Sequence, residues 1–218
     1  TPANFTGLDF QIDEASTLAG YVASGVSKTK VLATYGGQQF PGVTRFMDGL
    51  YAGIQYHNQQ KGTSVTLLGW DGSLPDPTTT GTFVGGSGGS DTWGDPAKGE
   101  QYAKTFLDQG VDIVHPVAGA TGNGTIAAML AAGKWAIGVD TDQAISIAES
   151  AGAILTSSQK AIDVSVVDVI KKNAGGDLGG EDYSGTLENA GVLLAPYHDF
   201  EDDISAELKA EVETLKAA

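Results

Sequence analysis

Apolar and polar positions alternate with two different periods along the chain, and the period changes repeatedly. Short apolar runs predict β-strands at 30–35, 63–70, 111–119 and 134–140. Between these runs, apolar residues three and four positions apart predict helices, most clearly over 43–54. Strands that alternate with helices in this way predict an α/β fold, in which helices cover both faces of a parallel sheet.

The segment 95–110 carries the residues that usually begin and end a helix. Asp95 is a favourable N-cap, Pro96 suits the first helical position, and Gly110 suits a stop. A second helix, rich in small residues, is predicted over 122–132. Both helices lie between predicted strands, which agrees with the α/β pattern.

Several predicted strands end in residues that could contact a ligand. Gly36-Gly37, Trp70, Gly119 and Asp140 each stand at the carboxyl end of a different strand. In open parallel sheets, ligands bind beyond these ends, where loops and helix N-termini gather. The sequence therefore predicts a binding site at this edge of the sheet.

The segment "AIGVDTDQ" at 136–143 ends an apolar run in two carboxylates, Asp140 and Asp142. A short helix is predicted to start near Gln143, so either aspartate could cap it. Asp142 is next to this start and fits the cap better. We therefore expect Asp140 to serve the ligand and Asp142 to serve the structure.

A long connection, 71–95, is rich in glycine and has no clear periodic pattern. Loops of this length are uncommon in compact α/β units unless they are functional or disordered, and the glycines favour a flexible flap. Trp93 stands near the end of the connection, just before the predicted helix. A tryptophan in a polar, glycine-rich loop predicts either stacking on a ligand or packing against the hinge or the next helix.

The chain has 27 acidic and 12 basic residues, which gives a formal net charge of −15. The basic residues are scattered, so binding to nucleic acid or to an anionic membrane is not expected. There are no cysteines, which excludes disulfides, thiolate chemistry and cysteine–zinc sites. No apolar run approaches the ~18 residues that a membrane-spanning helix needs.

Catalytic motifs are weak in this sequence. The histidines His57, His115 and His198 do not have metal-ligand spacing, and we expect His115 to be a satisfied core or rim residue. Neither a nucleophile elbow nor a phosphate-binding loop is present. "GATGNG" at 119–124 lacks the third glycine of a dinucleotide fingerprint. We therefore expect a binding protein without a cofactor rather than an enzyme.

Successive blocks of the chain resemble the basic membrane protein family, the PnrA-like substrate-binding lipoproteins of ABC transporters. The most specific pair is "GVDTDQ" at 138–143 followed by "LTSSQK" at 155–160. Three longer blocks stand in the same order with compatible spacing: "GLDFQIDEASTLAGYVAS" (7–24), "GGQQFPGVTRFMDGLYAGI" (36–54) and "DPAKGEQYAKTFLDQGVDIVHPVAGATGNG" (95–124). The similarity covers nearly the whole chain.

The resemblance implies a type I periplasmic-binding-protein fold, in which two α/β lobes close on a ligand, with purine nucleosides as the known ligands. Asp140 matches the carboxylate expected to accept hydrogen bonds from sugar hydroxyls, and Lys160 matches the hinge-side lysine that reaches the same sugar. Gly119 matches a glycine whose backbone faces the ligand. Trp93 stands where an aromatic ring stacks on the base or sugar.

The family's first lobe has no counterpart for most of its length in this chain. The resemblance therefore implies a second lobe with returning pieces of the first, divided as a crossover strand (1–12), the second lobe (13–153), a hinge strand and helix (154–183), and a final strand and C-terminal helix (184–218). An amphipathic helix is expected over 158–173. It would expose Val164, Val167 and Ile170 unless the missing lobe, or a second copy through a homodimer or lobe swap, covers them.

The same resemblance implies an extracytoplasmic protein that delivers its ligand to an ABC transporter permease. In the full-length precursor it would be lipid-anchored, through a signal and an anchor cysteine that this chain does not contain. Two alternatives stay open: the ligand could be another small polar molecule such as a free sugar, or the fold could be the effector-sensing domain of a regulator.

Overall fold

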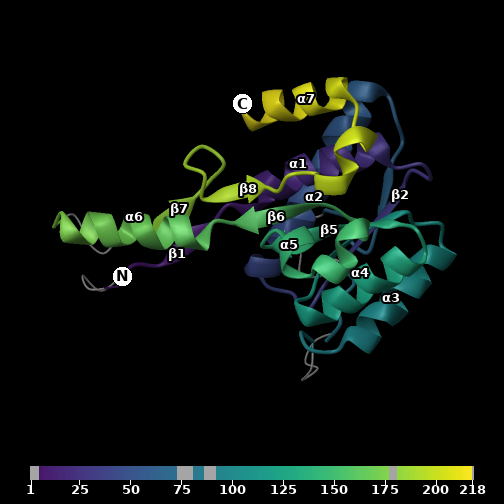
Figure 1. The fold of residues 1–218 in the computed structure, drawn as a ribbon, viewed down its shortest axis with the longest axis horizontal. Helices are drawn as coiled ribbons and strands as arrows, with labels where there is room; N and C mark the ends of the chain where they lie inside the picture. The colour runs from purple at the N-terminus through teal and green to yellow at the C-terminus, as the bar shows by residue number, and fades with distance from the viewer. Residues whose placement is uncertain (1–4, 73–80, 86–91, 177–180, 218) are drawn as a thin grey trace.

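A computed structural model describes residues 5–72, 81–85, 92–176 and 181–217. Its centre is a sheet of six strands in the order β3-β2-β4-β5-β6-β8, with the first five strands parallel and β8 antiparallel to β6 (Figure 1). The strands are β2 (Val31–Gly36), β3 (Thr66–Leu68), β4 (Ile113–Val117), β5 (Trp135–Asp140), β6 (Ile154–Lys160) and β8 (Val192–Leu194). The predicted α/β class and parallel sheet are therefore confirmed.

Helices cover both faces of this sheet, as the alternating pattern predicts. Helices α1 (Ile12–Val26) and α2 (Pro41–Lys61) pack on one face, where Leu18 and Leu50 join Ile113 of β4 in a buried cluster. The other face carries α3 (Pro96–Asp108) and α4 (Ala120–Ala131), followed in sequence by α5 (Gln143–Ser146) and the short 3₁₀ helix η1 (Ala148–Ala153). The Asp95 side chain caps α3 by accepting a hydrogen bond from Lys98 N at 3.0 Å, as its sequence predicts.

Helices α1 and α2 approach each other so closely that only glycine fits at three contact points. A Cβ atom added to Gly20, Gly49 or Gly53 would collide with backbone atoms of the facing helix. At Gly53 the collision would be with the carbonyl oxygen of Thr17. This close approach fixes how α2, and the side chains that it presents, lie on the sheet.

A smaller unit projects from the main sheet on one side (Figure 1). It contains β1 (Leu8–Phe10) and β7 (Tyr183–Gly185), which pair in parallel, and helix α6 (Ile162–Ala174). The side chain of Ser165 is buried on α6, whereas five apolar residues are exposed: Ile162, Val164, Val166, Val167 and Ile170. The expected exposure of an apolar face is confirmed.

Two sequence-based helix boundaries differ from the structure. The helix expected over 158–173 begins only at Ile162, because residues up to Lys160 continue β6 and pair with β8. The C-terminal helix α7 (Ala206–Lys216) follows the 3₁₀ helix η2 (His198–Asp203) and begins where Ser205 Oγ accepts a hydrogen bond from Leu208 N at 3.2 Å. The polar residues at both places fit a strand end or a loop as well as the first turn of a helix, so the apolar period does not locate where the helix starts.

The glycine-rich connection is partly bound to the sheet. Phe83 forms a parallel bridge with Gly36, and the flanking backbone hydrogen bonds Gly36 N to Thr82 O and Val84 N to Gly36 O are both 2.9 Å long. Residues 81–85 of the expected flap are therefore attached to the end of β2 by backbone hydrogen bonds. Residues 73–80 and 86–91 of this connection lie outside the described residues.

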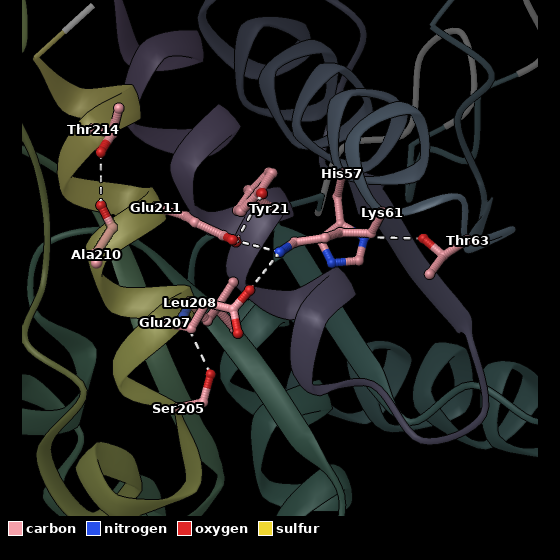
Figure 2. A network of polar contacts seen from close by, with 10 residues as sticks. All are labelled: Tyr21, His57, Lys61, Thr63, Ser205, Glu207, Leu208, Ala210, Glu211 and Thr214. Atoms are coloured by element: carbon pink, nitrogen blue, oxygen red, sulfur yellow. Dashed lines mark hydrogen bonds and ion pairs between the residues drawn. The ribbon is translucent and has the colours of Figure 1, made fainter.

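Helix α7 is held on α1 and α2 by apolar contacts and by a polar network (Figure 2). Lys61 forms ion pairs with Glu207, at 3.1 Å, and with Glu211, which also accepts a hydrogen bond from the Tyr21 hydroxyl. Burial and the hydrogen bond to Glu211 raise the pKa of Tyr21 above its ordinary value, so its hydroxyl stays protonated and donates. Within the described ranges, no helix is long and apolar enough to cross a membrane.

A test of the close helix packing is the substitution Gly53→Ala. Alanine favours a helix by about 1 kcal/mol over glycine, but its Cβ would push α2 away from the Thr17 carbonyl, and such overpacking costs about 1–3 kcal/mol. We expect a net loss in the free energy of unfolding, measured by urea denaturation. The control is Ala52→Gly at the exposed neighbouring position, which reports helix propensity alone; a stabilised Gly53→Ala protein would contradict the close packing.

The buried carboxyl group of Asp48 predicts a dependence of stability on pH. Desolvation and the nearby Asp13 charge raise its pKa to about 6, against the hydrogen bond from Trp70 Nε1 at 2.8 Å, which lowers it. Since the folded protein binds this proton more tightly than the unfolded chain, stability falls as pH rises from about 4 to 6.

Asp48→Asn keeps the hydrogen-bond acceptor for Trp70 and removes the charge. We expect it to raise the free energy of unfolding by about 1 kcal/mol at pH 8 and to change it little at pH 4. Urea denaturation at the two pH values measures the difference, with Asp202→Asn at an exposed position as the control. Equal stabilisation at both pH values would mean that the charge is not the cause.

Candidate ligand-binding site

The carboxyl ends of four neighbouring strands meet along one edge of the sheet. In the strand order, β2, β4, β5 and β6 are adjacent and parallel, so Gly36, Val117, Asp140 and Lys160 end at the same side. The four residues that the sequence assigns to a ligand all lie on these strands or on the loops at this edge. The topology therefore brings together what the sequence separates by many residues.

Asp140 and Lys160 form an ion pair at the ends of β5 and β6. Lys160 Nζ lies 2.9 Å from Asp140 Oδ1. The side chain of Lys160 is 21% exposed and that of Asp140 is 52% exposed. Asp140 has a φ of 65°, in the left-handed region that aspartate tolerates better than most residues. This turn ends the strand and leaves the carboxylate accessible, so it can accept hydrogen bonds from a ligand beyond the sheet.

Phe46 of α2 lies beneath the ammonium group of this pair. Lys160 Nζ is 4.8 Å from the centroid of the Phe46 ring, which is itself 1% exposed. A cation over an aromatic face is attracted by the ring quadrupole. Phe46 therefore helps to fix Lys160, a role that its place in a helical apolar stripe does not reveal.

His115 of β4 is buried and packs edge-to-face against the Phe46 ring. Its ring centroid is 5.9 Å from that of Phe46, and complete burial lowers the pKa of His115 to about 3, so the imidazole is neutral. Burial agrees with the expected core position. Neither ring nitrogen has a hydrogen-bond partner among the residues that the structure describes, so the expectation of a satisfied histidine is wrong there.

Asp142 has the structural role that the sequence predicts. Its Oδ1 accepts a hydrogen bond from Ala144 N at 3.2 Å and caps α5, while its Oδ2 lies 2.7 Å from His198 Nε2. Gln143 turns back and accepts a hydrogen bond from Val139 N at 2.8 Å. These contacts occupy Asp142 and leave Asp140 as the carboxylate at the edge.

Trp93 packs against two glycines, Gly37 and Gly119, which follow the ends of β2 and β4. A Cβ atom on Gly37 would lie 2.5–2.7 Å from three carbons of the Trp93 ring, and Gly119 faces the Trp93 backbone and Cβ. Thr121 N donates a hydrogen bond to Trp93 O at 3.1 Å, which ties the loop to the start of α4. Trp93 is nevertheless 37% exposed to solvent. The structure places the ring at the edge of the sheet, and its stacking on a ligand stays a prediction.

Gly119 is needed for the backbone as well as for the ring. Its φ of 56° and ψ of −136° form the N-cap of α4, a conformation that other residues rarely adopt. Because β4 and β5 are neighbours, Gly119 and Asp140 follow adjacent strands. The same edge of the sheet therefore carries an aromatic ring, a carboxylate and an ammonium group.

This set of groups suits binding rather than metal chemistry. The carboxylate accepts hydrogen bonds, the ammonium group donates them, and the indole ring offers a flat apolar face. In the part of the chain that the structure describes, no group of three or more histidine, cysteine, aspartate or glutamate residues could hold a metal ion.

Comparison with known proteins gives a matching family and several curated relatives. The family described as "ABC transporter substrate-binding protein PnrA-like" matches residues 1–79 and 88–216. The CD4+ T-cell-stimulating antigen of Listeria innocua is 28% identical over 98% of this chain and 57% of its own length. Basic membrane protein A of Borreliella burgdorferi is 30% identical over 73% of this chain and 40% of its own length. The chain thus spans about half the length of the curated relatives it matches.

A solved structure supports the fold over the same region. The solute-binding protein of an ABC transporter system from Aeropyrum pernix K1 superposes with a TM-score of 0.74 and 24% identity, over 95% of this chain and 62% of that chain. The periplasmic-binding-protein type of fold that the sequence resemblance implies is confirmed. Because the family match covers nearly the whole chain, we conclude that this chain belongs to the PnrA-like family of ABC transporter substrate-binding proteins.

Proposed function

We propose that this chain belongs to an extracytoplasmic solute-binding protein that binds a purine nucleoside, or a similar ribosyl ligand, between two lobes for uptake. The observation that carries the proposal is the Asp140–Lys160 ion pair at the sheet edge, which also carries the Trp93 ring packed on Gly37. A nucleoside offers hydroxyl groups to the pair and a flat base to the ring. No single one of these groups would identify the ligand, but their combination on neighbouring strands favours it.

The hydroxyl groups of a ribose match the carboxylate of Asp140. A vicinal diol offers two donors, and a carboxylate with an accessible face can accept both. Hydrogen bonds to a charged group contribute about 1.5–3 kcal/mol each. Lys160 would donate to the same sugar and would offset the Asp140 charge when a second lobe excludes water.

The ring of Trp93 matches the base. Stacking of a base on an aromatic side chain contributes about 1–3 kcal/mol. A free sugar is the alternative ligand, since it could use Asp140 and Lys160 and place one face of its ring on Trp93. An effector-sensing domain of a regulator is a further alternative, but no feature of the described residues favours it over transport.

We propose that the rest of a first lobe covers the exposed apolar side chains of α6. Five of them are exposed in this chain, and β1 and β7 beside α6 form only a two-stranded sheet. A complete first lobe would extend this small sheet and bury the α6 face. Where that lobe is absent, two copies could pair through the same face, as a homodimer or a lobe swap.

The proposed partners follow from this role. A closed, ligand-bound form would dock on an ABC transporter permease, and the full-length precursor would be lipid-anchored outside the cytoplasm. Recognition of ligand and closure by hinge motion need no chemical step, so we propose a binding protein and not an enzyme.

The substitution Asp140→Asn tests the proposed sugar contact. Asparagine keeps the size and tolerates the positive φ of this position, whereas alanine would add backbone strain. Removing the charge weakens both proposed hydrogen bonds and leaves Lys160 without its partner. We expect at least a tenfold loss of affinity for a purine nucleoside, measured by titration calorimetry.

The titration compares adenosine, guanosine, inosine, uridine and ribose, both with this chain and with this chain extended by a first lobe of its family. Asp199→Asn, at an exposed position of η2, is the matched control and should bind like the unaltered protein. Full nucleoside affinity in Asp140→Asn would exclude the assigned role, and absence of binding in both proteins would exclude a nucleoside ligand.

A further inference from the structure

We propose that Phe40 is a second aromatic contact for the ligand and makes the site select a planar ring over a free sugar. This inference rests on the proposed function and goes beyond it, because Phe40 is neither among the residues assigned above nor explained by the fold. The starting observation is its exposure: 46% of this large apolar side chain is open to water at the sheet edge.

The position of Phe40 in the fold does not call for phenylalanine. Phe40 is the N-cap residue of α2, directly before Pro41, and its side chain makes no capping hydrogen bond. Serine, threonine, aspartate and asparagine are the residues that stabilise this position, by up to about 2 kcal/mol over an apolar side chain. A residue that forgoes the cap and exposes an aromatic ring is therefore poorly accounted for by the stability of the helix.

The Phe40 ring nevertheless has close neighbours on two sides. A Cβ atom on Gly42 would lie 2.9 Å from Phe40 Cε2, so the ring folds back over the first turn of α2, where glycine leaves space for it. On the other side, the Phe40 and Trp93 rings meet with centroids 6.1 Å apart and an angle of 68° between their planes. This is the edge-to-face geometry that aromatic pairs prefer.

Phe40 and Trp93 together form an aromatic corner at the carboxyl end of β2. Trp93 rests on Gly37, and its contact with Phe40 leaves both rings more than a third exposed. A planar heteroaromatic ring could stack on one face of this corner while the second ring meets its edge. A free pentose carries hydroxyl groups around its ring and would cover less of the apolar surface, so the corner favours a ligand with a base.

A bracing role is the competing explanation, in which Phe40 only holds Trp93 in place. The two roles give different results with two ligands. A brace would affect every ligand that touches Trp93, whereas a direct contact with the base would affect a nucleoside and leave free ribose unchanged. The comparison of inosine with ribose therefore separates them.

The experiment is ¹⁹F NMR on the full chain labelled with 5-fluorotryptophan, titrated with inosine and with ribose up to millimolar concentration. Of the three tryptophans in the chain, Trp70 is 3% exposed and Trp135 is packed against Phe200, so their signals report an intact fold. The Trp93 signal reports the site. The substitution Phe40→Leu keeps the apolar volume and removes the aromatic face, and Phe40→Tyr restores that face.

We expect Phe40→Leu to weaken inosine binding about tenfold and to change ribose binding by less than twofold, while Phe40→Tyr binds inosine like the unaltered chain. Unchanged inosine affinity in Phe40→Leu would overturn the inference and leave the proposed function standing. An equal loss for both ligands would also overturn it, in favour of a brace. If the unaltered chain binds ribose but no nucleoside, the proposed nucleoside ligand fails, and the inference fails with it.

Discussion

The parallel pairing of β2, β4, β5 and β6 is the constraint on which the site depends. In the register of the sheet, Gly36 pairs with Val117 and Asp140 pairs with Gln159, so the strands end almost level. Each end then delivers a different group without a long loop: a glycine turn, a helix N-terminus, a carboxylate or an ammonium group. Antiparallel pairing would send alternate strand ends to the opposite edge and separate these groups.

Glycine residues also help to position the site, because they let large groups come close to the backbone. Gly37 and Gly119 admit the Trp93 ring between two strand ends, and Gly20, Gly49 and Gly53 let α2 lie tightly on α1. The same close packing holds the Phe46 ring under the ammonium group of Lys160. Side chains at the site are therefore positioned by close contacts with the backbone, which limits how far they can move when a ligand binds.

The sequence predicts the elements and part of the site, for reasons that particular residues make clear. Asp95 and Asp142 are local caps, and each is recognisable because the residue it bonds is at most three positions away. The Asp140–Lys160 contact joins residues on separate strands, so only the family resemblance pointed to it. The role of Phe46 is not predicted, because a helical period reports which face is apolar and not which ring lies under a charge. The start of α6 was placed too early for a related reason, since "SSQK" fits a strand end as well as a helix start.

The partly exposed Asp140–Lys160 pair suits the proposed binding of a neutral polar molecule. The pair is partly exposed, and an ion pair in water stabilises a fold by about 0–1 kcal/mol, so it is not needed for folding. When a second lobe closes, an isolated carboxylate would lose its water at a large cost, but a paired carboxylate with no net charge loses much less. Phe46 adds to this by holding the ammonium group in place before any ligand arrives, so that the ordering of a long lysine side chain does not oppose binding. A ligand with hydroxyl groups can then replace the lost water on both charges, which a purely apolar ligand could not do.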